Sequence, residues 1–560
     1  MRYKRGCGRY LGGVIVFVMI SIVFAVPASA QTPETDDTPS GDAGETQSGL
    51  DQVIDLLEKK GVISHQEAEA LKRRQVSSEM QPEQRAEPSP EPGGGSDEEE
   101  NRSEIQRLEE KIERQMDHVQ TNTRLNTRKI EQLEEQRIDR LADENRKSSW
   151  AQRISLAGDI RVRYQKDLFD DDNGMFYRPE NPDDDNLMNS TEDRERFRAR
   201  LRLALKANIV DPRDINVGKV VAGIRVTTGN TDDPVSTNDT MGDYFNKDSI
   251  VLDRYFLKWS YAPELPVWGR IPQVNLTVGR MPNPWFSSDL VWDDDLNFEG
   301  ATLNLLTDTL EANGWYIFFT AGAYPLQELE IEKDDKWLYA GQVGFHMTPL
   351  YGLGVTLGAA YYDYQNITGR ANDPLEPGLY DYTAPAYMQK GNTLFYIDPP
   401  DDTLTALAAE YKIVDITGEV DISYFFPVHI ILGGTYAKNI GFDQEEVSRR
   451  VGVERVPEET EAYRLALKVG YPVIFNFGEW NFFYEYKYIG ADAVLDAFTD
   501  SDFHLGGTDA KGWIAGIELG LYRNVWLRTR WITSDAIIDD PYVNDRFAID
   551  TFQLDINARF

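Results

Sequence analysis

The sequence is poor in cysteine, in positive charge and in long apolar runs. Cys7 is the one cysteine among 560 residues, which excludes a disulfide scaffold and any zinc site built from cysteines. The formal net charge is -36, which argues against nucleic-acid binding because little basic surface is left to neutralise phosphates. A mean hydropathy of -0.49 with 27% charged residues excludes a helical membrane protein.

Patterns typical of enzymes are also scarce. The five histidines show neither a Ser-His-Asp order nor the spacing of metal ligands. Glycine-rich stretches end apolar runs and do not open helices, so nucleotide binding finds no support. The acidic runs at 170–174 and 183–185 lack the full ligand spacing of a calcium loop. We therefore expect no catalytic activity, no metal and no cofactor.

Residues 1–30 are typical of a secretory signal peptide. Basic residues precede an apolar core from Leu11 to Val26, and Ala28-Ser29-Ala30 provides small residues for cleavage. An uncleaved anchor helix is the alternative. Cleavage would remove Cys7 together with four basic residues and no acid, leaving the mature chain more acidic.

Four segments of distinct composition follow the signal. Thr, Asp, Gly and Ser dominate 31–49, which we interpret as a disordered leader. Residues 50–75 predict a short helical hairpin around Gly61, and 76–103 have the composition of a linker. Apolar residues recur every three or four positions in 104–149, which predicts a self-associating α-helical coiled coil. A single amphipathic helix lying on another surface is the alternative for this last segment.

From Trp150 onward the hydrophobic period changes from 3.6 to 2. The last run, FQLDINARF, alternates strictly and carries its apolar row to the final residue, Phe560. About sixteen such runs follow one another, and short turns such as 523–524 alternate with long acidic loops such as 365–402. Short turns at one rim and long loops at the other are typical of an up-and-down barrel in a bacterial outer membrane.

The sequence therefore predicts an all-β transmembrane antiparallel β-barrel of about sixteen strands over 150–560, preceded by a periplasmic coiled coil. Lipid leaves no backbone group unpaired, so the last strand must pair with the first. The alternative is a soluble β-sandwich or solenoid, which would not explain aromatic residues at the strand ends.

Several stretches resemble the bacterial "putative porin" family of outer-membrane channels. They are 223–243, 249–261, 278–303 and 426–439, while 50–72 is similar to a segment often found ahead of such barrels. The resemblance implies a water-filled homotrimeric pore in contact with outer-membrane lipid and lipopolysaccharide. Phe560 also resembles the terminal signal that the barrel-assembly machinery reads. The N-terminal region would lie in the periplasm, where the coiled coil could bind peptidoglycan.

The segment PNPWFSSDLVWDDDLN, residues 282–297, is the candidate pore constriction. In general porins, which the chain resembles in architecture, the corresponding third loop folds into the lumen. Asp289, Asp293, Asp294 and Asp295 would line the waist and attract cations, while Trp285 and Trp292, with Phe286, would anchor the loop to the inner wall. The alternative is an extracellular loop whose acids bind divalent ions and lipopolysaccharide.

A basic wall is expected opposite these acids. Alternation points eight arginines of the first two and last two strands into the lumen: Arg161, Arg163, Arg198, Arg200, Arg202, Arg528, Arg530 and Arg559. These four strands become neighbours when the barrel closes, and acids facing bases would create a transverse field. The alternative is that the arginines pair with lumen acids for structure.

Passive diffusion of small hydrophilic solutes, with a mild preference for cations, is the function that these features favour. Two others stay open. The coiled coil could make the protein a tether between outer membrane and cell wall, and the lumen arginines could make the channel selective for anions or phosphate.

Overall fold

The computed structural model describes residues 153–174, 189–210, 218–262, 272–307, 314–329, 334–401, 403–538 and 546–560. The predicted signal peptide, leader, helical hairpin, linker and coiled coil lie outside these residues and stay predictions.

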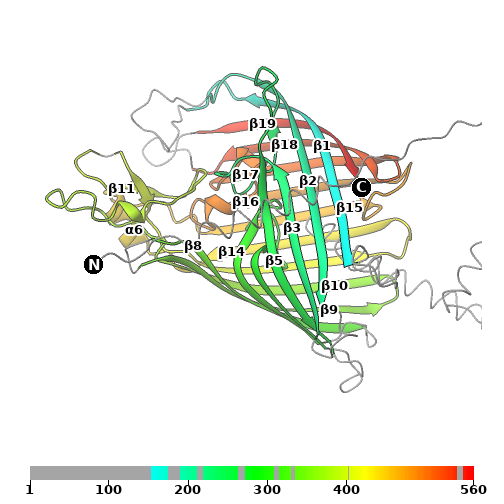
Figure 1. Cartoon of the computed structure of the whole chain (residues 1–560). Coiled ribbons are helices and arrows are strands. Elements are labelled where there is room, and N and C mark those ends of the chain that lie inside the picture. The colour runs from blue at the N-terminus through cyan, green and yellow to red at the C-terminus, as the bar shows by residue number, and fades with distance from the viewer. Residues whose placement is uncertain are drawn as a thin grey trace, which may run out of the picture. The chain divides into compact units, whose positions relative to one another are not determined.

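Sixteen long strands of the described residues form one closed antiparallel barrel (Figure 1). In chain order they are β1 (Ile154–Phe169), β2 (Arg194–Val210), β3 (Lys219–Thr228), β5 (Ile250–Tyr261), β6 (Gln273–Pro282), β7 (Asn297–Leu306), β8 (Trp315–Gln327), β9 (Lys336–Leu350), β10 (Leu353–Gln365), β13 (Lys412–Ile422), β14 (His429–Asn439), β15 (Glu461–Gly470), β16 (Trp480–Ile489), β17 (Ala510–Tyr522), β18 (Val525–Ala536) and β19 (Ala548–Arg559). The predicted sixteen-stranded barrel is thus confirmed.

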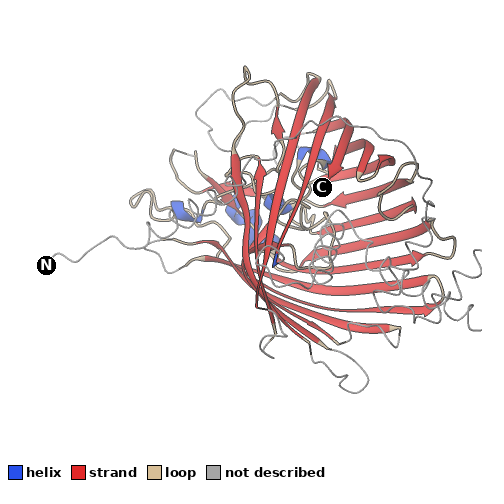
Figure 2. Ribbon diagram, turned by 45° about the vertical axis from the view of Figure 1, so that its right-hand side comes forward, coloured by secondary structure: helices blue, strands red, loops and turns tan. Residues whose placement is uncertain are grey.

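The remaining elements are short and lie in the connections. Strand β4 (Asp239–Thr240) pairs with β2, and β11 (Leu394–Tyr396) pairs with β12 (Thr405–Leu407) in a separate two-stranded sheet. The helical elements are η2 (Asp381–Thr383), α6 (Gln444–Val451), η3 (Asp496–Phe498) and η4 (Phe503–Leu505). Figure 2 shows these loops and helical turns gathered within the curve of the strands and toward one end.

The barrel closes between its first and last strands. The β1–β19 ladder runs from Asp159↔Arg559 to Phe169↔Ile549. At its end the Phe560 backbone N–H donates to the Gly158 carbonyl and the Gly158 N–H donates back to the Phe560 carbonyl, both at 3.0 Å. The final residue therefore completes the ladder, as a sheet surrounded by lipid requires.

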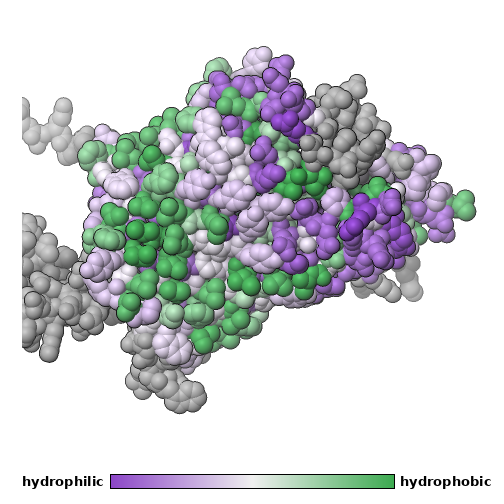
Figure 3. All heavy atoms as spheres, turned by 180° about the vertical axis from the view of Figure 1, so that it is seen from behind, coloured by the Kyte–Doolittle hydropathy of each residue, from purple (hydrophilic) through white to green (hydrophobic). Residues whose placement is uncertain are grey.

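The outer face of the wall is apolar. Along β1, exposed Leu156, Ile160 and Val162 alternate with inward Arg161 and Arg163, and the other strands alternate in the same way. Hydrophobic residues cover much of the wall in Figure 3, with hydrophilic residues gathered toward one end. Stacked aromatic pairs, such as Trp259 with Tyr261, lie near strand ends. This distribution matches a band of hydrocarbon bounded by two interfaces.

None of the described helices is long and apolar enough to cross a membrane.

The lumen is partly filled from the long-loop rim. The loops 283–296 and 490–509 are largely buried, and with the buried residues of 366–411 they join inward side chains of β8 to β10 in one apolar cluster. Two of these loops meet at the waist of the barrel. We call 283–296, between β6 and β7, loop 3, and 490–509, between β16 and β17, the inner loop.

Candidate channel constriction

Loop 3 leaves the wall at a pair of glycines. Gly279 of β6 lies opposite Gly300 of β7, with φ of +115° and +147°, so both strands depart from regular extended geometry at the same level. A Cβ on Gly300 would come within 2.2 Å of the Ala323 carbonyl oxygen, which leaves glycine as the residue that fits. Beyond this level the chain continues into loop 3, which packs inside the barrel.

Two tryptophans anchor loop 3 to the inner wall. Trp285 and Trp292 are 4% and 1% exposed. Trp292 meets the rings of Phe298, Tyr362 and others at centroid distances of 4.9 to 6.5 Å, and Trp285 packs edge-on against Tyr362 at 5.5 Å. Both side chains thus lie in the buried cluster behind the loop and do not line the open cavity.

A polar clamp holds the same loop by its backbone. The Phe286 N–H donates to Gln342 Oε1 at 2.9 Å, and Gln342 Nε2 donates to the Phe286 carbonyl at 2.8 Å. Gln342 points inward from β9 and is buried, and the Phe286 ring meets Phe318 of β8. Loop 3 is therefore fixed to β8, β9 and β10 by both apolar and polar contacts.

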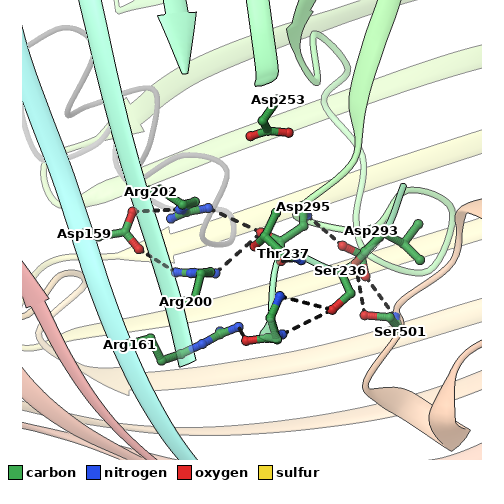
Figure 4. Close-up of polar contacts among 12 residues, drawn as sticks. Asp159, Arg161, Arg200, Arg202, Ser236, Thr237, Asp253, Asp293, Asp295 and Ser501 are labelled. Atoms are coloured by element: carbon green, nitrogen blue, oxygen red, sulfur yellow. Dashed lines mark hydrogen bonds and ion pairs between the residues drawn. The ribbon is translucent and has the colours of Figure 1, made fainter. Parts of the chain in front are cut away.

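Asp295 faces the arginines of β2. Its carboxylate lies 3.5 Å from Arg200 and 3.3 Å from Arg202, and it accepts a hydrogen bond from Thr237 at 2.9 Å (Figure 4). Asp159 binds the same two arginines from β1, at 2.9 and 2.7 Å. Burial alone would raise the pKa of Asp295, but the two guanidinium groups hold it below its usual value.

Asp289 faces the opposite part of the wall. It lies 2.8 Å from the Lys487 ammonium and 3.3 Å from the Arg464 guanidinium, on β16 and β15. Asp294 lines the cavity near Arg464. Asp293 accepts from the backbone N–H groups of Asp295 and Ser501.

Burial raises the pKa of Asp293 well above its usual range, and the neighbouring Asp295 and Asp500 add to the effect. Asp293 therefore has a weaker tendency to carry charge than Asp295.

The inner loop is part of the same structure, although its composition is that of an ordinary acidic surface loop. The Asp293 N–H donates to the Phe498 carbonyl at 2.7 Å, which joins loop 3 to it directly. Its Asp500 binds Lys487 at 2.6 Å, and its Asp502 binds Arg163 at 2.9 Å and also contacts Arg530. The pKa of Asp502, which burial acts to raise, is held well below its usual value by these arginines.

The eight predicted arginines all point to the inner face of the barrel. Arg163 is fully buried between Asp502 and Asp555, while Arg161 and Arg198 donate to Asn238 and Ser236. Five of the eight line the open cavity: Arg161, Arg200, Arg528, Arg530 and Arg559. The strands that carry them, β18, β19, β1 and β2, are consecutive neighbours in the closed sheet.

The prediction from the sequence did not include other charged residues in the narrow part of the channel. Arg464, Lys468, Glu485, Lys487 and Glu518 come from β15 to β17 and point inward, paired with one another or with the loops. The alternation in 462–470, 479–488 and 512–522 already placed them on the polar face, so the signal was present.

The open cavity encloses about 1500 Å³, part of which opens to solvent, and both signs of charge line it all around. The expected separation into an acidic loop and one basic wall is therefore incomplete, because basic side chains of β15 and β16 meet loop 3 from the other side. Within the described ranges, no group of three or more His, Cys, Asp or Glu side chains is arranged to hold a metal ion.

A closed barrel with an apolar exterior and a charged waist formed by an inserted loop defines an outer-membrane channel. The model of the "putative porin" family matches residues 47–560, and the chain belongs to that family. No curated protein matches the sequence.

Solved bacterial porin structures are similar at low identity. OmpF of Salmonella typhi, in complex with daunomycin, is 12% identical with a TM-score of 0.37, over 73% of this chain and 97% of that one. OprB of Pseudomonas putida is 10% identical with a TM-score of 0.40, over 73% and 94%. The channel DcaP of Acinetobacter baumannii is 12% identical with a TM-score of 0.36, over 73% and 97%.

Proposed function

We propose that the channel passes small hydrophilic solutes by diffusion, with selectivity set by the charges where loop 3 and the inner loop meet the wall. The observation that carries the proposal is the fixation of loop 3 inside the barrel by Trp285, Trp292 and Gln342. A rigid constriction with charged walls filters by size and by charge without any chemical step.

The proposed preference for cations is mild, because most of the predicted acids are neutralised in place. Asp289 and Asp295 each contact two basic side chains, and the raised pKa of Asp293 favours its neutral form. The excess of acids over the whole chain supports the residual preference for cations. The second candidate, a channel for anions or phosphate, is favoured by a different observation. Arg161 and Arg198 hydrogen-bond to neutral side chains, which leaves their positive charge available to anions.

Reversal potentials of the purified protein in a planar bilayer, under a potassium chloride gradient, separate these two candidates. We expect a small potential of cation sign, and a potential of anion sign would favour the second candidate. Asp295→Asn should shift the potential toward anions because it removes one of the two carboxylates that Arg200 and Arg202 contact, whereas Asp373→Asn, in the exposed part of the loop 366–411, should not. An unchanged potential in Asp295→Asn would place this carboxylate outside the ion path.

The assembly of the protein is proposed on its family membership. We propose a homotrimer in the outer membrane, inserted by the barrel-assembly machinery through the signal at Phe560, with the N-terminal region in the periplasm. Light scattering of the detergent-purified protein tests the trimer, because a monomeric mass under conditions that preserve the folded barrel would contradict it. The tether hypothesis concerns residues outside the described ranges and stays a prediction.

A further inference from the structure

A second cavity lies behind loop 3, at a break in the barrel wall. Among the described strands, the β7–β8 ladder runs from Leu306↔Phe318 to Ala301↔Ala323 and stops, while the β8–β9 ladder continues to Gln327↔Lys336. Residues 297–300 of β7 and 324–327 of β8 are therefore not paired with each other. We call this unpaired stretch the seam.

The seam lies at the level expected for the membrane interface. On its β9 side, the outward rings of Trp337 and Tyr339 stack with a centroid distance of 5.7 Å, as in an interfacial aromatic girdle. On its β7 side, Arg280 and Glu299 form an exposed ion pair at 3.7 Å. The seam thus opens where hydrocarbon gives way to polar head groups.

The cavity that adjoins the seam is lined mainly by apolar residues, together with the polar residues Arg280, Asn297, Glu299, Gln327, Lys336, Tyr387 and Asp496. It encloses about 1050 Å³, including its open mouth. Its apolar lining comes from the wall, from loop 3 and from the inner loop, and includes Trp292, Phe298, Tyr324, Leu326, Leu338 and Phe498. Gln327 and Lys336 face each other across the last pair of the β8–β9 ladder and form the polar part of the lining nearest the rim.

Lys336 is the unusual feature of this cavity. Its side chain is 3% exposed, and its ammonium donates to the carbonyl oxygens of Thr383 and Ala384 at 3.2 and 2.6 Å. No carboxylate of the described residues lies within salt-bridge distance of it. A buried ammonium without a counter-charge is costly even where carbonyl oxygens accept its hydrogen bonds. This observation points to an anionic group supplied by a ligand.

We propose that this cavity binds a single-chain amphiphile with a carboxylate head, a fatty-acid anion that enters from the membrane through the seam. The head meets the Lys336 ammonium at the rim, and the chain lies deeper, between Leu338 and Trp292. This polarity agrees with the membrane, because the charged end stays at the interface and the apolar end is removed from water. The site is separate from the ion path, since loop 3 turns its aspartates to the channel and Trp292 to this cavity.

Photo-crosslinking tests the proposal on the purified full-length protein in lipid nanodiscs. A long-chain fatty acid that carries a diazirine should label peptides containing 292–298, 324–327 and Leu338. Excess oleate should reduce this labelling at least tenfold, and oleyl alcohol should not. Labelling spread evenly over outward residues such as Leu276 and Ile317, or equal competition by the alcohol, would overturn the proposal.

Variants separate the head site from the chain site. We expect Lys336→Gln to reduce labelling about tenfold and Lys336→Arg to retain it, while Leu338→Trp should abolish labelling by filling the apolar end. Lys412→Gln is the matched control, because Lys412 also begins a strand at this rim but binds Glu410 on the surface. Labelling unaffected by Lys336→Gln and Leu338→Trp, in barrels whose heat-dependent gel mobility shows that they are folded, would overturn the site. Conductance recorded on the same samples tests the proposed channel function independently.

Discussion

Truncation of Trp292 is the sharpest test of the idea that loop 3 is a fixed constriction. The side chain is 1% exposed and contacts the rings of Phe298, Tyr362, Tyr364 and Phe498. Replacing a buried tryptophan by alanine costs about 3–5 kcal/mol. The barrel ladder does not depend on this side chain, so the loss falls on the attachment of loop 3.

This loss of free energy sets how much more often loop 3 should detach from the wall in the variant. A factor of ten corresponds to about 1.4 kcal/mol, so the detached state of loop 3 should become at least about a hundredfold more populated in Trp292→Ala. Detachment stays a minority event because Gln342 still clamps Phe286 and Lys487 still binds Asp289. Single-channel recordings should therefore show brief steps to a larger conductance, about a hundred times more often than in the unaltered protein.

The control is a tryptophan on the outer face. Trp480 of β16 is 42% exposed, and Trp480→Ala should leave the recordings unchanged. Both variants should keep the heat-dependent gel mobility of a folded barrel. If Trp292→Ala shows the same conductance level and the same noise as the unaltered channel, loop 3 does not limit the pore and the reasoning is wrong.

Three further predictions concern other groups of the constriction and the wall. Lys487→Met leaves Asp289 and Asp500 without their shared cation, so the melting temperature should fall, with a loss of about 3–5 kcal/mol, and the reversal potential should move toward cations. Burial raises the pKa of Asp496 to about 7, so its contribution to inner-loop stability is full below pH 3.8 and falls as the pH rises to about 7. Hydrogen exchange of 490–509, corrected for its intrinsic rate, should show this decline in stability, and Asp496→Asn should remove the decline. Burial lowers the pKa of Lys390 to about 7, so the contribution of Lys390 to stability rises as the pH increases above that value. Gly300→Val should lower the yield of folded barrel, by strain of about 1–3 kcal/mol and by the clash with Ala323, whereas Gly341→Val, where a Cβ meets no atom within 4 Å, should not.

The wall of the barrel was largely predictable from the sequence because its information is local. Alternation with period 2 gives each strand its inner and outer face, so one correct assignment along β1 places Arg161 and Arg163 together. Closure of the sheet then brings β18 and β19 beside β1 without further information. The inward arginines are a consequence of these two rules alone.

The partners of the inner loop were not predictable in this way. Asp500 and Asp502 look like ordinary acids of a polar loop, and their partners Lys487 and Arg163 are 13 and 339 residues away. Neither periodicity nor composition indicates that such a loop folds inward, because the reason lies in long-range contacts. Asn392, for example, donates to the carbonyls of Ala491 and Val494 from a different loop.

The glycine pair at the base of loop 3 connects the channel cavity with the cavity behind that loop. Gly279 and Gly300 allow β6 and β7 to leave regular geometry together, and loop 3 then packs inside the barrel. The β7–β8 ladder ends at Ala301↔Ala323, one residue from Gly300, so the seam begins where the strand deviates. In a membrane, an unpaired stretch of wall must be covered by protein or by a ligand. The glycine pair that allows loop 3 to narrow the channel therefore also gives rise to the cavity behind that loop. A bound acyl chain in this cavity would support Trp292 from the side opposite the pore.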